Sequence, residues 1–200
     1  MSTGGRAMVC SRSVTLIALG ANAGQGVSVN RHRVAAAAAA LRARLGPALR
    51  FSRAWRTPAF PPGAGGDFVN ACALLPRPVD PARALADLHA IEARAGRKRH
   101  LRWTARILDL DLLAVGGLIR PDIPTLRAWI DLPVARQMHE TPGNLLLPHP
   151  RLQDRAFVLG PLMDLAPDWR HPLTGRSVAA MWARIPARDR TRLRPLGRPL

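Results

Sequence analysis

Two aspartates in one apolar segment, Asp109 and Asp111, are the residues with the clearest potential for chemistry. Because side chains alternate across a β-strand, both carboxylates would face one side of a sheet, with Cα atoms ~6.6 Å apart. Leu108, Leu110 and Leu112 would face the other side and enter a core. Mg²⁺ in proteins prefers one or two carboxylates together with phosphate oxygens of a substrate. The spacing therefore predicts a site for a magnesium-bound polyphosphate.

Cations stand directly before these aspartates, in residues 97–106. Guanidinium groups form paired hydrogen bonds to phosphate oxygens, so several arginines beside two carboxylates favour phosphoryl-type transfer. The arginines of this segment are Arg97, Arg99, Arg102 and Arg106. Trp103 lies among them, and taken alone it is more typical of a cover on a core edge than of a cation–π partner.

Two further groups of residues suit a nucleotide and a flat heterocycle. His149 lies between two prolines and Arg155 follows it, so both are candidates for phosphate contacts, although a lone histidine is more often an ordinary loop residue. Phe68 and Asn70 lie two positions apart, and Phe157 follows Arg155. An aromatic face beside an amide suits a heterocycle, whereas each phenylalanine taken alone is more typical of a core.

The segments that must position these groups alternate between strand-like and helix-like patterns. We expect strands at residues 14–20, 49–55, 68–75 and 107–115, and helices from Ser28 or Asn30 to about residue 45, from Pro81 (capped by Asp80) to about residue 95, and at residues 157–165 and 177–185. The first six elements follow a β-α-β-β-α-β order, which predicts an α+β, ferredoxin-like sandwich with an antiparallel sheet. Two helices would cover one face and leave the other for loops and ligands.

We expect one domain, residues 14–185, between a flexible N-terminal tail (1–13) and a basic, frayed C-terminal tail (186–200). Residues 118–147 form an insertion after the fourth core strand, with a short helix near residues 126–138. The insertion suits either a lid or an oligomer contact, and the sequence does not choose between them.

Composition narrows the class of protein. The chain is 48% hydrophobic, enough for a core, yet no apolar run approaches the ~20 residues that span a bilayer. Two cysteines make no disulfide framework and no apolar signal segment follows the first residues, so we expect a cytoplasmic protein. The net charge of +17 suggests a nucleic-acid partner, but Lys98 is the only lysine, and this preference for arginine fits a GC-rich coding bias as much as selection for a polyanion.

Taken in order, these motifs resemble those of the 6-hydroxymethyl-7,8-dihydropterin pyrophosphokinases, folate-pathway enzymes with a ferredoxin-like fold. The resemblance spans roughly residues 14–175 and rests on several motifs at nearly the family's spacing. They are Ala18-Leu19-Gly20-Ala21-Asn22, Arg56-Thr57-Pro58, Asp67-Phe68-Val69-Asn70-Ala71, Ile91-Glu92 through Gly96-Arg97-x-Arg99, Arg102-Trp103-x-x-Arg106-x-Leu108-Asp109-Leu110-Asp111-Leu112, Pro148-His149-Pro150-Arg151 and Arg155-x-Phe157-Val158-Leu159-x-Pro161-Leu162.

The resemblance implies transfer of pyrophosphate from ATP to the hydroxymethyl group of 6-hydroxymethyl-7,8-dihydropterin, giving AMP and the pterin diphosphate. It implies two Mg²⁺ ions held by Asp109 and Asp111, and catalytic roles for Arg97, Arg106, Asp109 and Asp111. It implies pterin binding by Thr57, Pro58, Phe60, Phe68, Asn70, Trp103 and Phe157, and ATP binding by Glu92, Arg99, Arg102, Trp103, Arg106, Leu112, His149 and Arg155. The expected partners are these small molecules, with no nucleic acid and no membrane, and we expect a monomer.

Two other functions are compatible with the same order of elements. RNA-recognition domains carry a Lys/Arg-Gly-aromatic signature on the third strand, which residues 68–75 lack. Paired aspartates would also repel RNA unless a metal intervened. A metal-free acyl-phosphate hydrolase leaves the same aspartates unexplained, so the pyrophosphokinase is our prediction.

Overall fold

The computed structural model describes residues 13–24, 26–58, 66–96, 107–133, 136 and 139–200. In chain order the elements are β1 (Thr15–Ala21), α1 (Gly26–Leu45), β2 (Arg50–Phe51), β3 (Arg53–Thr57), β4 (Phe68–Leu75), α2 (Pro81–Arg94), β5 (Asp109–Val115), α3 (Ile123–Asp131), η2 (Leu152–Asp154), α5 (Ala156–Leu165), α6 (Val178–Arg184), α7 (Ala187–Arg190) and β6 (Arg194–Pro199). The strands form one antiparallel sheet in the order β5-β1-β4-β3-β6, with β2 also paired to β4. The predicted α+β, ferredoxin-like fold is confirmed.

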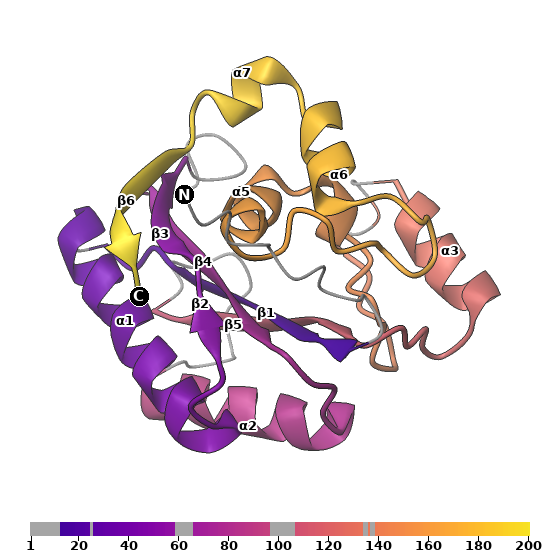
Figure 1. Cartoon of the computed structure of the whole chain (residues 1–200), viewed down its shortest axis with the longest axis horizontal. Coiled ribbons are helices and arrows are strands. Elements are labelled where there is room, and N and C mark those ends of the chain that lie inside the picture. The colour runs from indigo at the N-terminus through magenta and orange to yellow at the C-terminus, as the bar shows by residue number, and fades with distance from the viewer. Residues whose placement is uncertain (1–12, 25, 59–65, 97–106, 134–135, 137–138) are drawn as a thin grey trace, which may run out of the picture.

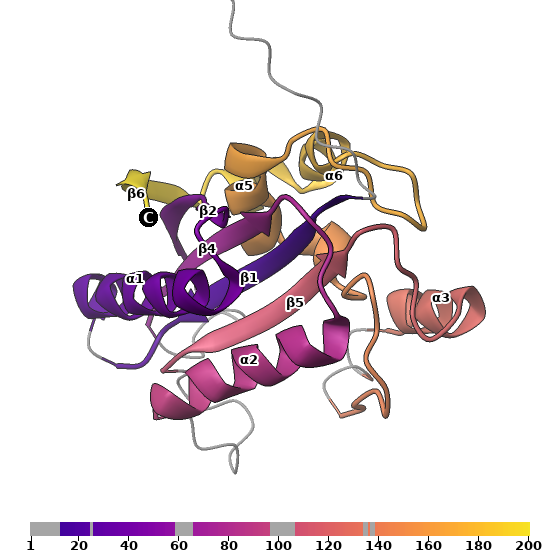
Figure 2. The same cartoon turned by 60° about the horizontal axis from the view of Figure 1, so that its bottom comes forward.

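The sheet is covered on both faces. Helices α1 and α2 lie together on one side, and α5 and α6 lie on the other, as Figure 2 shows. The core under α1 and α2 includes Leu19, Leu41 and Leu88, all fully buried. The core under α5 and α6 includes Leu159 and Trp169, also fully buried. The second face is therefore open to ligands only in part, because the C-terminal helices cover the rest of it.

The second predicted strand is interrupted at Ser52. β2 and β3 both pair with β4, but their registers differ by one residue, since Phe51 lies opposite Ala73 whereas Trp55 lies opposite Asn70. The hydroxyl of Ser52 replaces a backbone acceptor at the break, because Cys72 N donates to Ser52 Oγ (2.9 Å). The prediction of one continuous strand at residues 49–55 is thus wrong at this position.

The predicted start is confirmed for α2 and is wrong for α1. α2 begins at Pro81, and Asp80 caps it by accepting a hydrogen bond from Arg83 N (2.7 Å). α1 begins at Gly26, so Ser28 and Asn30 lie inside the helix and the prediction that either one caps it is wrong.

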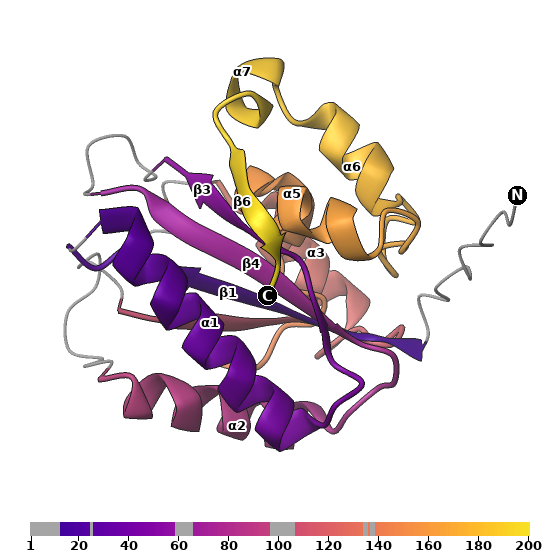
Figure 3. The same cartoon turned by 60° about the vertical axis from the view of Figure 1, so that its left-hand side comes forward.

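The C-terminal segment is not frayed. Residues 194–199 form β6, which pairs with β3 along the edge of the sheet (Figure 3). Two prolines and a glycine give this segment a low intrinsic preference for a strand. The strand forms because the backbone edge of β3 supplies hydrogen-bonding partners. Leu196 and Leu200 pack against the core under α1.

The insertion carries a helix, α3, that starts and ends earlier than the predicted residues 126–138. Asp122 caps it by accepting from Thr125 N (2.7 Å). A β-bridge between Arg120 and Leu147 ties the two ends of the insertion together. α3 projects from the Val115 end of β5, the end opposite Asp109, as Figure 1 and Figure 2 show. Among the described helices, none has the length and apolar character needed to cross a membrane.

Candidate active site

Asp109 and Asp111 lie on the same face of β5, and both side chains are half buried. The residues between and beyond them, Leu110 and Leu112, are buried in the core under α1 and α2. The two carboxylates therefore face the side of the sheet that carries α5. The alternation of acids and leucines that the sequence predicted is confirmed. A β-bulge at Leu113 changes the register with β1, but only after Asp111.

The strand register lines up the polar residues of three strands. Residues directly opposite each other in an antiparallel sheet share a face. Asp109 lies opposite Gly20, and Gly20 lies opposite Asn70, so these three positions form one row across β5, β1 and β4. In the next row Asp111 lies opposite Ala18. The β1 positions between the acids and the amide, Ala18 and Gly20, thus carry no large side chain.

Asn70 is buried and held in one orientation. Its Nδ2 donates to Thr57 Oγ1 (2.7 Å), and Thr57 lies opposite Phe68 where β3 and β4 meet. A β-carbon built on Gly20 would stand 2.7 Å from Asn70 Oδ1, so the amide fills the space that glycine leaves. Pro58 directly follows Thr57 and is half buried. Four of the residues predicted to bind pterin thus lie together at one corner of the sheet.

The start of α5 brings two more predicted residues to this face. Arg155 immediately precedes the helix, and its Nη1 lies 3.9 Å from Asp111 Oδ2. Its guanidinium carbon lies 5.5 Å from the centre of the Phe157 ring. Burial lowers the pKa of Arg155, and the negative charge of Asp111 opposes that change. Arg155 therefore supplies a positive charge beside the acidic pair.

His149 lies along the edge of β5, because its backbone N donates to Leu113 O (2.8 Å). Burial, followed by the charge of Arg155, lowers the pKa of His149 to about 3, so the ring is neutral at ordinary pH. Its Nδ1 accepts a hydrogen bond from Arg151 N (3.0 Å). This bond assigns the proton to Nε2, which makes that atom a donor.

The side chains of Glu92 and Leu112 lie on the face of the sheet that α1 and α2 cover, opposite the two carboxylates. Glu92 is 2% exposed, and its Oε1 accepts from Leu110 N (2.8 Å), the amide between the two aspartates. It therefore holds β5 from the α2 side. The side chain of Leu112 is buried in the core, so a contact between this residue and a nucleotide would use its backbone atoms.

Six of the predicted site residues lie outside the described residues. They are Phe60, Arg97, Arg99, Arg102, Trp103 and Arg106. The described residues thus place the acidic pair, the amide corner and the start of α5 together.

The described residues contain no group of three or more His, Cys, Asp or Glu side chains arranged to hold a metal ion. A closed protein cage is the arrangement expected for a structural metal, whereas Mg²⁺ on a polyphosphate takes only one or two carboxylates. Asp109 and Asp111, half buried and facing an open row of small residues, fit the second kind of site.

A groove of about 550 Å³ lies elsewhere, between α1 and α2. It is lined mainly by alanines with Arg33, Arg44 and Arg94. Because it lies on the opposite face of the sheet from the carboxylates, it is separate from this site.

Two structural features near this site were not predicted from the sequence. The need for glycine at position 20 has a sequence signal, since a glycine within an apolar strand marks a close approach of another group. The contacts of Asp164 on α5 with Arg53 and Trp55 on β3 have no local signal, because more than a hundred residues separate the partners.

Known proteins resemble this chain in both sequence and fold. A family model described as 7,8-dihydro-6-hydroxymethylpterin-pyrophosphokinase matches residues 16–167. Two relatives are named 2-amino-4-hydroxy-6-hydroxymethyldihydropteridine pyrophosphokinase. The one from Synechocystis is 36% identical over 64% of this chain and 55% of its own length. The one from Pseudomonas aeruginosa is 41% identical over 60% of both chains. The chain thus spans little more than half the length of these relatives.

Solved structures of Plasmodium falciparum HPPK-DHPS share the fold. One, a triple mutant, superposes with a TM-score of 0.56 at 12% identity, covering 86% of this chain and 44% of the other. At this identity the likeness concerns the fold alone.

Proposed function

The chain belongs to the 7,8-dihydro-6-hydroxymethylpterin-pyrophosphokinase family, and on that premise we propose that it transfers pyrophosphate from ATP to 6-hydroxymethyl-7,8-dihydropterin. The products are AMP and the pterin diphosphate, an intermediate of folate biosynthesis. The observation that carries this proposal is the shared face of Asp109 and Asp111, with Arg155 beside them and Asn70 across Gly20.

The amide corner suits the pterin. Asn70 uses one N–H on Thr57, which leaves its other N–H and its carbonyl oxygen for the edge of a heterocycle. Phe68 at the start of β4 and Phe157 at the start of α5 are both half buried and lie on the same side of the sheet. Stacking on these rings supplies affinity, while Asn70 discriminates between ring edges.

The acidic pair suits the phosphates. Asp109 and Asp111 would hold two Mg²⁺ ions, which when bound neutralise charge on the transferring group and make the attacking hydroxyl more acidic. Arg155, which lies beside Asp111, and the Nε2–H of His149, at the edge of β5, would bind the anionic nucleotide. By resemblance, Arg97, Arg99, Arg102 and Arg106 close over the triphosphate, with Trp103 and Phe60 at the pterin.

The mechanism needs no protein nucleophile. Phosphoryl-type transfer depends on in-line positioning and on cations that stabilise developing charge. Asn70 and the aromatic rings would set the hydroxymethyl oxygen in place, and the arginines would stabilise charge as the bond between the α- and β-phosphates breaks. ATP, the pterin and Mg²⁺ are the partners in this proposal, which places a monomer in the cytoplasm where ATP is available.

The test is to incubate purified protein with ATP, MgCl₂ and 6-hydroxymethyl-7,8-dihydropterin and to separate the nucleotides. We expect AMP to form in amounts equal to the pterin diphosphate, and we expect EDTA to stop the reaction. Formation of ADP in place of AMP, or formation of AMP when no pterin is added, would refute the proposal.

A further inference from the structure

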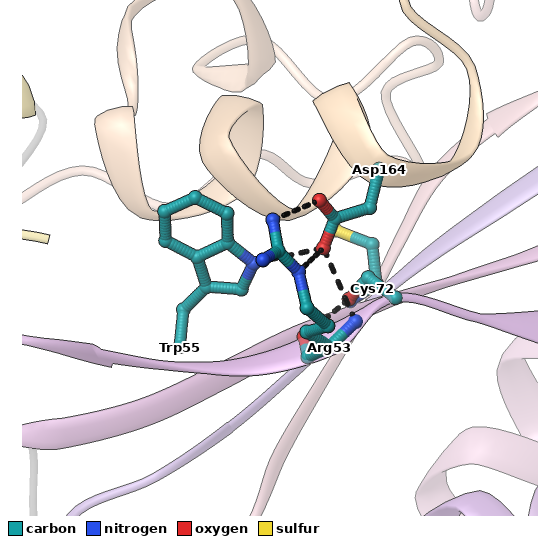
Figure 4. Close-up of polar contacts among 5 residues, drawn as sticks. Arg53, Trp55, Cys72 and Asp164 are labelled. Carbon is teal, nitrogen blue, oxygen red and sulfur yellow. Dashed lines mark hydrogen bonds and ion pairs between the residues drawn. The ribbon is translucent and has the colours of Figure 1, made fainter. Parts of the chain in front are cut away.

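Asp164, in the last turn of α5, ties this helix to β3. Arg53 donates to its carboxylate from the backbone N (3.2 Å), from Nε (3.1 Å) and from Nη2 (2.7 Å). Trp55 Nε1 donates to the same carboxylate (3.1 Å). Figure 4 shows the carboxylate reaching down from the helix to both side chains of the strand. One acid thus accepts four hydrogen bonds from two residues of a neighbouring element.

A cation–π contact adds to the ion pair between Arg53 and Asp164. The guanidinium carbon of Arg53 lies 5.3 Å from the centre of the Trp55 ring, so the two donors are stacked on each other. The hydrogen bond and charge of Asp164 raise the pKa of Arg53, and the same charge adds to the burial that raises the pKa of Cys72. A carboxylate that accepts two parallel hydrogen bonds from one guanidinium is fixed in direction as well as in distance.

The position of Asp164 along the helix links the cluster to the site. Asp164 follows Phe157 by seven residues, which is about two helical turns, so both side chains lie on one stripe of α5. Phe157 packs against the core that this helix shares with the sheet. A shift of α5 at Asp164 would therefore move the Phe157 ring and Arg155 relative to the strands below them.

The start of α5 is also held by packing, because Val158 and Leu159 are buried in the core that the helix shares with the sheet. Pro161 lies inside the helix and lacks the N–H that would bond to Phe157 O. In the first turn of the helix, Cys72 Sγ donates a weak hydrogen bond to Val158 O (3.6 Å). The helix is therefore fixed more by its contacts with the sheet than by its own hydrogen bonds.

We propose that Asp164 is a positioning residue of the pterin site: it clamps α5 onto β3 so that Phe157 faces Phe68 and Arg155 faces Asp111. This inference rests on the proposed function for its substrate, but its geometric part concerns only α5 and β3. A purely structural contact would contribute to stability without changing how the folded protein binds pterin.

The test compares Asp164→Asn with a matched control, Asp87→Asn. Asp87 also pairs with an arginine, Arg44, and it links α1 to α2 away from the site. The two carboxylates are similarly covered, with side chains 15% exposed at Asp164 and 20% at Asp87. Asparagine keeps the size of aspartate but loses the charge and one acceptor oxygen.

We expect Asp164→Asn to lower kcat/KM for the pterin roughly tenfold at a temperature where the variant is fully folded, since a small misplacement of binding groups is costly. Asp87→Asn should leave kcat/KM unchanged, and Asp164→Glu should recover part of the loss. Equal kcat/KM for Asp164→Asn and Asp87→Asn, with only the melting temperature of Asp164→Asn lowered, would overturn the inference. If Asp164→Asn does not fold, Trp55→Phe serves instead, since it removes one of the four donors.

Hydrogen–deuterium exchange separates failure of this inference from failure of the proposed function. The amides of Val158 and Leu159 bond to Arg155 O (3.0 Å each) in the first turn of α5. We expect their exchange to speed up in Asp164→Asn but not in Asp87→Asn, whatever the substrate is. If the wild-type protein makes no AMP, the proposed function fails, and unchanged exchange at these amides would refute the clamp independently.

Discussion

Gly20 lies directly opposite Asn70 in the pairing of β1 with β4, and a β-carbon on Gly20 would stand 2.7 Å from Asn70 Oδ1. Real β-carbons essentially never approach an oxygen so closely. The absence of a side chain at Gly20 therefore allows the Asn70 amide its orientation, and Thr57 fixes that orientation by accepting a hydrogen bond from Asn70 Nδ2.

Gly20→Ala should displace the Asn70 amide and weaken pterin binding. Loss of one oriented hydrogen bond is worth about 1.4 kcal/mol, which raises the dissociation constant roughly tenfold. Calorimetric titration with the pterin measures it. Gly143→Ala is the control, because a β-carbon there meets nothing within 4 Å. Wild-type affinity in Gly20→Ala would show that this close approach does not matter for binding.

Removal of residues 194–200 should destabilise the fold. This truncation deletes β6, uncovers the edge of β3 and exposes core surface covered by Leu196 and Leu200. Two half-buried leucines correspond to roughly 2–3 kcal/mol of unfolding free energy. Urea denaturation of the truncated and full chains checks this value. A change below about 0.5 kcal/mol, the usual range for surface changes, would mean that the strand adds no stability.

His171 should make the protein less stable in acid. The residue is fully buried, and burial lowers its pKa to about 4, below the ordinary value of 6.5. As the pH falls, His171 takes up a proton in the unfolded chain before it does so in the folded one. The stability that the neutral, buried ring contributes is therefore complete above about pH 6.5 and is lost as the pH falls to about 4. The loss is about 3 kcal/mol for such a change in pKa.

His171→Asn isolates this contribution. Asparagine retains an oxygen that can accept from Leu173 N and Thr174 N, as His171 Nδ1 does. We expect the variant to lose less stability than the wild type between pH 6.5 and 4, measured by urea denaturation at several pH values. Parallel losses in both proteins would rule out His171 as the source.

Arg106 tests the role of the cationic segment before β5. If this arginine stabilises charge in the transition state, Arg106→Ala should lower kcat roughly a hundredfold while changing pterin affinity much less. Single-turnover kinetics at saturating ATP measure the chemical step. A normal rate with a raised KM for ATP would assign Arg106 to ground-state binding.

Local chemistry explains which features could be predicted from the sequence. The alternation of Asp109 and Asp111 with leucines needs one buried face, and the Asp80–Pro81 pair sets a helix start by its own hydrogen bond. Non-local contacts explain the misses. β6 forms because β3 offers an unpaired edge, and Asp164 acquires its role from residues of a distant strand. α1 starts at Gly26 without the cap that either Ser28 or Asn30 was expected to supply.

The most direct test of the central claim counts the metal ions that we propose Asp109 and Asp111 to hold. Mn²⁺ in place of Mg²⁺, with α,β-methylene-ATP to prevent transfer, can be counted by electron paramagnetic resonance as bound ions per chain. We predict about two bound ions in the wild type, in keeping with carboxylates shared with phosphate oxygens, and loss of tight binding in Asp109→Asn and Asp111→Asn. Unchanged number and affinity of bound Mn²⁺ in both variants would contradict the account.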